Sequence, residues 1–257
     1  MARQIRLDSA GYYHIVNRGV ARSNIYQNGT DKEKFLEIVC KACKMYKANV
    51  HDYCLMDNHY HLLIQTTEDN LSLLMHQISS NYAIYFNRKY GRVGHLWQGR
   101  FKSWFVFKEE YLYLLIRYIE NNPLKANLSK RVGEYPFTLA SNLINHIPVI
   151  PCAESSLMIK EFDTESLEGV LEIELTDEER KLLDTEQKRK ITEDDNGDIS
   201  ISRSRTLEEH FQDSCGKQAR DAAVYNAYLD GYPQSEIAKQ IGKSASLVSK
   251  IVKGFHG

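Results

Sequence analysis

A chain of 257 residues with 42% hydrophobic and 26% charged side chains is long enough for one large domain or two modest ones. The net charge is −1, but it is unevenly distributed: residues 151–200 carry 16 acidic and 6 basic side chains, and the remaining residues together carry a charge of +9. A basic remainder is compatible either with a surface that binds nucleic acid or with an ordinary solvated surface. Because the chain has no N-terminal apolar core, no membrane-length apolar run and only five irregularly spaced cysteines, we expect a cytoplasmic protein without a secretory signal, a membrane anchor or a disulfide framework.

The first part of the chain alternates strand-like and helix-like segments. Alternating apolar residues predict strands over 12–19, 49–56, 59–66 and 100–107. Helical spacing predicts helices over 30–48, with Thr30 as N-cap, over 70–91, ending at Gly91, and over 108–122, stopped by Pro123. The order β-α-β-β-α-β followed by another helix predicts an α+β fold, a ferredoxin-like or RRM-like sandwich.

Composition divides the chain into three parts. Residues 1–146 hold the α+β domain. Residues 147–205 are acidic and poor in aromatic side chains, which predicts a linker with one helix that starts at the capping box Thr176 to Glu179. Residues 206–257 return to a helical pattern and predict a small all-α domain.

Within that last part, the segment 234–253 has the spacing of two short helices. Ile237, Ala238 and Ile241 form an apolar edge, Gly242 permits a turn, and Ser244 can cap the second helix. The pattern resembles the helix-turn-helix of bacterial regulators, and a helical hairpin that only packs is the alternative. A helix-turn-helix would present to duplex DNA the residues Ser244, Ala245, Ser246, Ser249 and Lys250.

The stretch MDNHYHLLIQ places His59 and His61 two residues apart in a predicted strand. Alternate strand residues project from the same side of a sheet, so two imidazoles are available together for a divalent metal. A metal site needs a third ligand from elsewhere. On spacing alone, two ordinary core or surface histidines are the more frequent outcome.

The predicted helix over 108–122 offers such a ligand. Tyr118 and Asn122 lie four residues apart, so a phenol and an amide oxygen share one helix face, and Asn121 is a substitute. A hydroxyl beside a metal that holds a phosphate is a competent nucleophile. Spacing alone favours a packing role for Tyr118.

The motifs MDNHYHLLI, GHLWQGRFKS and YIENNPLKANL…YPFTLAS together resemble the REP-associated tyrosine transposases, relatives of the small single-strand transposases of the HUH nuclease superfamily. The resemblance covers roughly residues 9–143. It implies that His59, His61 and Asn122 bind Mg²⁺ or Mn²⁺, and that Tyr118 attacks single-stranded or hairpin DNA to form a 5′-phosphotyrosyl bond and a free 3′-hydroxyl. No small-molecule cofactor is implied. One departure is Asp57, where the family often has proline, and this extra carboxylate near the site could shift the metal preference.

The segment WQGRFKSW mixes cations with aromatic rings, as in proteins that pair phosphates and stack bases. An aromatic core is the alternative for at least two of the three rings. The residues expected to contact single-stranded DNA are Asn17, Arg18, Arg100, Phe101 and Lys102. Cys40-x-x-Cys43 has no second CxxC, so we interpret these cysteines as ordinary core or surface residues. His14, His51, His76, His95 and His146 show no ligand spacing.

We therefore expect a metal-dependent tyrosine transposase, that is, a site-specific DNA endonuclease and strand transferase of a bacterial cytoplasm. A DNA-binding regulator with an inactive or domesticated nuclease domain is the alternative. A metal phosphohydrolase with water as nucleophile is a third reading, but it needs carboxylate ligands that the sequence does not supply.

Overall fold

The computed structural model describes residues 7–106, 109–177, 179–180, 183–184, 190–193, 199–202, 206–212, 214, 216–229 and 232–254. Two compact units are present: Asp8–Arg180, and Met1–Leu7 together with Lys181–Gly257. No described helix is both long enough and apolar enough to cross a membrane.

The first unit is an α+β structure built on a four-stranded antiparallel sheet with the strand order β2-β3-β1-β4. Its strands are β1 (Gly11–Arg18), β2 (Ala48–Met56), β3 (His59–Thr66) and β4 (Lys102–Val106). Its helices are η1 (Val20–Arg22), α1 (Gly29–Met45), α2 (Leu71–Lys89), α3 (Glu109–Glu120), α4 (Asn122–Lys125), α5 (Leu139–Ile144), η2 (Pro151–Ala153), α6 (Leu157–Glu161) and α7 (Thr164–Glu172). The predicted order of strands and helices is the observed order.

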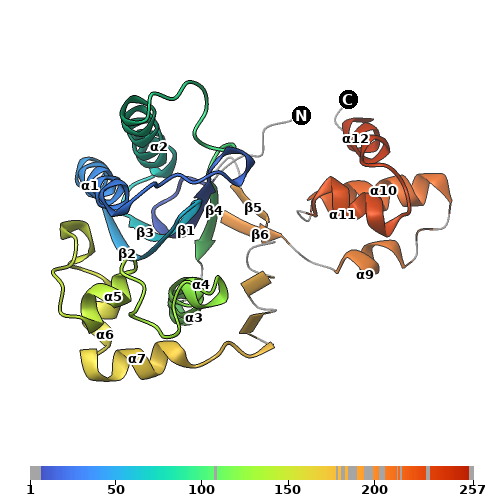
Figure 1. Cartoon of the computed structure of the whole chain (residues 1–257). Helices are drawn as coiled ribbons and strands as arrows, with labels where there is room; N and C mark the ends of the chain where they lie inside the picture. The colour runs from blue at the N-terminus through green and yellow to red at the C-terminus, as the bar shows by residue number, and fades with distance from the viewer. Residues whose placement is uncertain are drawn as a thin grey trace. The chain divides into compact units, whose positions relative to one another are not determined.

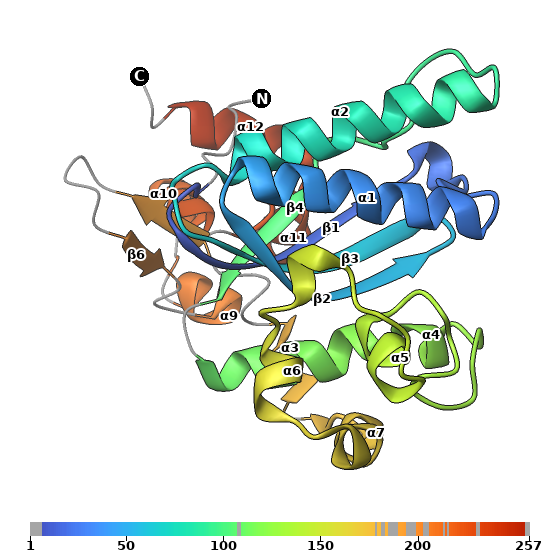
Figure 2. The same cartoon turned by 90° about the vertical axis from the view of Figure 1, so that its left-hand side faces the viewer.

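The sheet separates two layers (Figure 2), with α1 and α2 along one face and α3, α4 and α5 on the other side. Side chains alternate between these faces. Tyr60 of β3 packs against Phe35 of α1, with the ring centroids 4.8 Å apart. Its neighbour His61 therefore projects toward the side of α3, on which the candidate site lies.

Several element boundaries differ from the prediction. Asn28, rather than Thr30, caps α1, because its side-chain oxygen accepts from the backbone N–H of Asp31. The strand expected from residue 100 begins at Lys102. Residues 147–180 contain η2, α6 and α7 and belong to the first unit, and the expected capping box between Thr176 and Glu179 is present.

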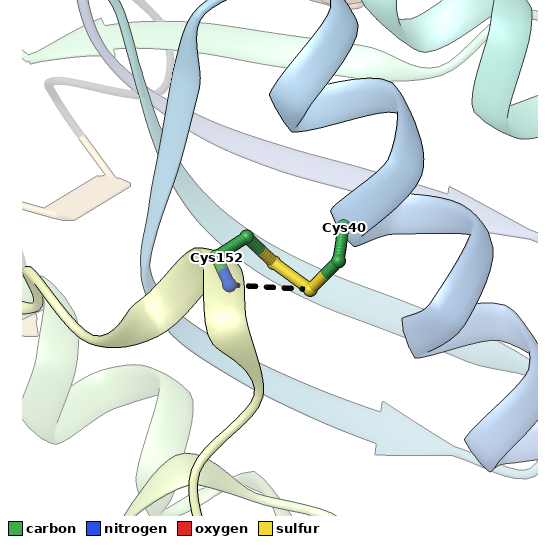
Figure 3. Close-up of a disulfide and its surroundings, with 2 residues drawn as sticks. All are labelled: Cys40 and Cys152. Atoms are coloured by element: carbon green, nitrogen blue, oxygen red, sulfur yellow. Dashed lines mark hydrogen bonds between the residues drawn. A yellow bond between two sulfur atoms is a disulfide. The ribbon is translucent and has the colours of Figure 1, made fainter.

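One disulfide links Cys40 of α1 to Cys152 of η2, 112 residues apart (Figure 3). Its presence corrects the expectation of a disulfide-free protein and of an unpaired Cys40. The pairing was invisible in the sequence because it depends on η2 folding back onto α1, from a segment whose composition resembles a linker. Cys43 and Cys54 are buried free thiols.

The second unit has a two-stranded sheet and a helical region (Figure 1). Its elements are β5 (Lys190–Glu193), β6 (Ile199–Ser202), α9 (Leu207–Phe211), α10 (Lys217–Leu229), α11 (Gln234–Gln240) and α12 (Ala245–Gly254). Residues of α10, α11 and α12 share one core, which includes Val224, Ile237 and Val248. Gly242 has a φ of +62° in the turn between α11 and α12, as its type predicts.

Candidate functional site

The central feature of the site is the histidine pair at the start of β3. His59 and His61 have ring centroids 5.2 Å apart, so both project to one side of the sheet. His61 is 5% exposed because β3 lies between β2 and β1, where it pairs with Cys54 and Val16. The pair is thus held on an inner strand with neighbours on both sides.

The turn before β3 is fixed by hydrogen bonds to the loop that follows β1. The carbonyl oxygens of Asp57 and Asn58 accept from the backbone N–H groups of Ile25 and Gly19, at 2.8 and 2.9 Å. The Asp57 carboxylate lies 2.9 Å from the ammonium group of buried Lys32 in α1. Asp57 therefore neutralises a cation of the opposite layer, which argues against a role as an additional metal ligand.

Both imidazoles of the pair are hydrogen-bonded through Nδ1, and the partner of His59 fixes the position of its proton. His59 Nδ1 donates to Asn58 Oδ1 at 2.6 Å, because an amide oxygen only accepts. His61 Nδ1 lies 3.0 Å from Nε2 of His14. Burial lowers the pKa of His61 well below its ordinary value and that of His14 to about 3, so both rings are neutral near pH 7. His59 thereby has Nε2 available as a ligand atom.

Tyr118 of α3 faces this cluster. Its ring centroid lies 5.9 Å from that of His61 and 6.0 Å from that of His14, both edge-on. The sequence separates Tyr118 from His61 by 57 residues. The fold brings them together because α3 packs on the sheet face that carries the histidines.

Asn122 begins α4 one turn after Tyr118. Its Nδ2 donates to the carbonyl oxygens of Tyr118 and Ile119 at 2.8 and 3.2 Å, which leaves its side-chain oxygen as the atom available to a ligand. The side chain of Asn121 is held toward α7 instead, because its Nδ2 donates to the Leu171 carbonyl there. Arg117 also turns away, toward an ion pair with Glu179 at 2.8 Å.

The donor set fits a divalent metal through two imidazole nitrogens and one amide oxygen. Among the described residues, no group of three or more His, Cys, Asp or Glu side chains is arranged to hold a metal ion. A third protein ligand beside the two imidazoles would have to be of another type, and the amide oxygen of Asn122 has the required chemistry.

Two neighbours of the site were missed by the sequence analysis. His14 on β1 contacts His61 directly, and no signal in the sequence marks it, because the contact depends on the register of β1 against β3. Lys125 has its ammonium group 4.5 Å from the centroid of the Tyr118 ring. Its signal was the spacing of seven residues, which returns to the same helix face.

The residues expected to contact single-stranded DNA separate into two groups. Arg18, Arg100 and Lys102 are exposed, and Arg18 pairs with His59 across β1 and β3. Asn17 and Phe101 are only 6% and 7% exposed, which disfavours their direct contact with DNA. The alternative of aromatic core residues therefore accounts for Phe101.

In the second unit, the expected DNA-contacting residues lie at or in α12. Ser244 Oγ accepts from the backbone N–H of Leu247 at 3.3 Å, as a cap. Ser244, Ser246 and Lys250 are exposed and Ser249 is half-buried, whereas Val248 is buried. The helix thus presents a polar face opposite its apolar one.

The solved structures similar to this chain have low sequence identity to it. A REP-associated tyrosine transposase bound to a REP hairpin is 19% identical over 58% of this chain and 90% of that one, with a TM-score of 0.48. A transposase candidate from Deinococcus radiodurans is 16% identical over 47% and 97%, with a TM-score of 0.33. The tRNA(His) guanylyltransferase of Saccharomyces cerevisiae is 12% identical over 73% and 81%, with a TM-score of 0.35. No curated protein matches the chain.

The fold and the site together define an α+β protein in which two sheet histidines face one helical tyrosine. Residues 8–122 match the family model described as "Transposase IS200 like", and through this segment the chain belongs to the IS200-like transposase family. By family it is a single-strand DNA nuclease or transposase, and nucleases of this family are generally metal-dependent.

Proposed function

We propose that this chain is a single-tyrosine DNA endonuclease and strand transferase that acts on single-stranded or hairpin DNA. Tyr118 is the nucleophile, and His59, His61 and Asn122 hold Mg²⁺ or Mn²⁺. The observation that carries the proposal is the edge-on contact between Tyr118 and His61, from segments far apart in the sequence. Nucleophile and ligand thus share one site within a single chain.

The chemistry of the site follows from these groups. A divalent metal, when bound, polarises a phosphoryl oxygen and offsets the charge of the transition state. The Tyr118 oxygen attacks phosphorus and loses its proton, while the leaving 3′ oxygen gains one. A 5′-phosphotyrosyl bond and a free 3′-hydroxyl result. Attack by another 3′-hydroxyl reverses the reaction and releases Tyr118, which joins the strands.

The cations around the site suit a phosphate backbone. Arg18 and Lys102 are exposed near the histidines, on strands β1 and β4, and Arg100 precedes β4. We assign phosphate contacts to these three residues. The order of the four strands supports a ferredoxin-like sandwich for the nuclease domain over residues 1–146.

The helical part of the second unit supports a second DNA contact. We propose that α11 and α12 form a helix-turn-helix within residues 206–257, with Ser244, Ser246, Ser249 and Lys250 toward the major groove. Because residues 147–180 belong to the first unit, the link to the helix-turn-helix lies after Arg180, and through it this part would raise the effective concentration of DNA at the nuclease domain.

The proposal is tested by incubating the full chain with a 3′-labelled single-stranded hairpin and Mn²⁺, since the fragment on the 3′ side of the cut is the one that stays bound to Tyr118. We expect a denaturant-resistant protein–DNA adduct that Tyr118→Phe abolishes. Tyr113→Phe is the matched control, since Tyr113 lies on the same helix but packs against Phe162. The adduct should persist in this control.

Other outcomes assign the chain to the rival functions. Metal-dependent cleavage that survives in Tyr118→Phe would identify a hydrolase that uses water. Binding without any cleavage by the wild-type chain would identify a DNA-binding regulator.

A further inference from the structure

His14 is a buried histidine on β1 that the proposed chemistry does not use. It is 1% exposed, and its ring is nearly parallel to that of His61, with an interplanar angle of 15°. Trp104 of β4 packs on it at a centroid distance of 5.2 Å. The ring is therefore clamped between its neighbours, and its Nε2 lies 3.0 Å from Nδ1 of His61.

The proton in this hydrogen bond decides what the other nitrogen of His61 can do. A neutral imidazole carries one proton, so one nitrogen donates and the other accepts. If His61 donates from Nδ1, its Nε2 keeps a lone pair for a metal. If His14 donates instead, His61 carries its proton on Nε2 and cannot act as a ligand there.

The position of His14 makes it a suitable fixed acceptor. It is attached to β1, which pairs with β3 along its whole length, so the two rings keep a constant register. When Nε2 accepts, the single proton of neutral His14 is on Nδ1, which is buried and has no hydrogen-bond partner among the described residues, so this arrangement leaves one buried N–H unsatisfied. An apolar side chain would fill this space without an unsatisfied polar atom, which indicates that the contact to His61 serves a purpose beyond packing.

We propose that His14 is a positioning residue, which accepts the Nδ1 proton of His61 and so aims the Nε2 lone pair of His61 at the metal. This inference rests on the proposed metal role of His61. Asn58 performs the same task for His59, through an amide oxygen in place of an imidazole. Partners of this kind orient ligating histidines in many metal sites.

The test compares His14→Leu, which fills the space without an acceptor, with His14→Gln, whose side-chain amide oxygen can replace Nε2. Mn²⁺ affinity of the full chain without DNA is measured by calorimetry. We expect a roughly 10- to 100-fold loss in His14→Leu and recovery of most of the affinity in His14→Gln. His51→Leu is the control, since His51 is a buried strand histidine bonded instead to Gln65.

A second measurement reads the proton directly. In metal-free protein labelled with ¹⁵N-histidine, we expect His61 to carry its proton on Nδ1 in the wild type and to lose this preference in His14→Leu. Wild-type Mn²⁺ affinity in folded His14→Leu, or a proton on Nε2 of His61 in the wild type, would overturn the inference. If the wild type binds no Mn²⁺, the proposed function fails, and the position of the His61 proton alone decides the role of His14.

Discussion

Lys125 lies seven residues after Tyr118, and the run from α3 into α4 carries both on one face. Its ammonium group over the ring of Tyr118 stabilises negative charge on the phenol oxygen. Partial burial and the nearby Arg180 lower the pKa of this lysine. At the residue scale, the charge of Lys125 acts on the proposed nucleophile, and it also contributes to the lowered pKa of His61.

We predict that Lys125→Met slows adduct formation about tenfold near pH 7, because losing a neighbouring cation raises the pKa of a phenol by about one unit. Single-turnover rates on the hairpin across a pH series measure the change. The slowing should diminish at high pH, where the phenol ionises without help. Lys130→Met removes an exposed lysine of the following loop and should react at the wild-type rate. An equal loss in both variants would count against a specific role.

At the scale of elements, two buried carboxyl side chains, Glu120 of α3 and Asp52 of β2, lie where α3 packs on the sheet. Glu120 of α3 is 1% exposed and accepts from the backbone N–H of Ala140 at 2.9 Å. Asp52 of β2 is fully buried, and the nearby charge of Glu120 acts on it. Burial raises the pKa of Glu120 to about 7, and burial and then the charge of Glu120 raise that of Asp52 well above its usual range. The pair therefore retains protons that the unfolded chain releases.

This pair makes stability fall as pH rises. A raised carboxyl pKa in the folded state contributes stability below about pH 4.5, and that contribution is lost as pH rises through about 7. Asp52→Asn keeps a donor to Glu120 but removes the second acid. We predict that the variant gains stability relative to wild type between pH 5 and 8, on the order of 2–3 kcal/mol.

Urea unfolding across this pH range measures the difference. Asp177→Asn is the control, because the side chain of Asp177 is 92% exposed and removing its charge should change the stability little. Parallel pH profiles for wild type and Asp52→Asn would show that the carboxyl pair does not retain its protons.

The elements were largely predictable from the sequence. Alternation and helical spacing are local signals, and they located four strands and the helices around them to within a few residues. The same locality explains why Tyr118 and Asn122 were recognised as sharing a face. Ring contact between Tyr118 and His61 required tertiary packing, and only the resemblance to a family anticipated it.

The remaining site features depend on strand register and on chain reversal. His14 meets His61 because β1 pairs antiparallel with β3 in one particular register, which spacing within a single strand does not reveal. Asn17 and Phe101 were predicted to contact DNA from residue type, but both side chains are buried, at the end of β1 and just before β4. The disulfide was missed because a segment with the composition of a linker folds back on α1.

At the scale of the whole molecule, the Cys40–Cys152 bond joins segments 112 residues apart. Closing so long a loop restricts the unfolded chain, so we predict that reduction lowers the free energy of unfolding by roughly 3–5 kcal/mol. Urea unfolding with and without dithiothreitol measures this. A Cys40→Ser/Cys152→Ser variant should have the same free energy of unfolding as the reduced wild type, and dithiothreitol should not change it. An unchanged wild type in dithiothreitol would contradict the prediction.

The second unit gives a further prediction at this scale. Lys250→Glu reverses a charge on the polar face of α12, so it should weaken binding to a hairpin with a flanking duplex about tenfold. Binding to the bare hairpin should not change, which electrophoretic mobility or fluorescence anisotropy measures at fixed salt. Lys217→Glu is the control, because it makes the same charge change at an exposed residue of α10. Equal weakening on both DNAs would place Lys250 outside duplex recognition.

Tyr118, whose ring contacts His14 and His61, also limits how many DNA ends one chain can hold. Under the proposed function, one tyrosine per chain means that one copy can hold one 5′ end covalently at a time. Two cuts that release a single-stranded segment create two such ends, the 5′ end of the segment and the 5′ end of the downstream flank. Holding both at once requires two copies of this chain, while one copy must finish with the first end before it takes the second.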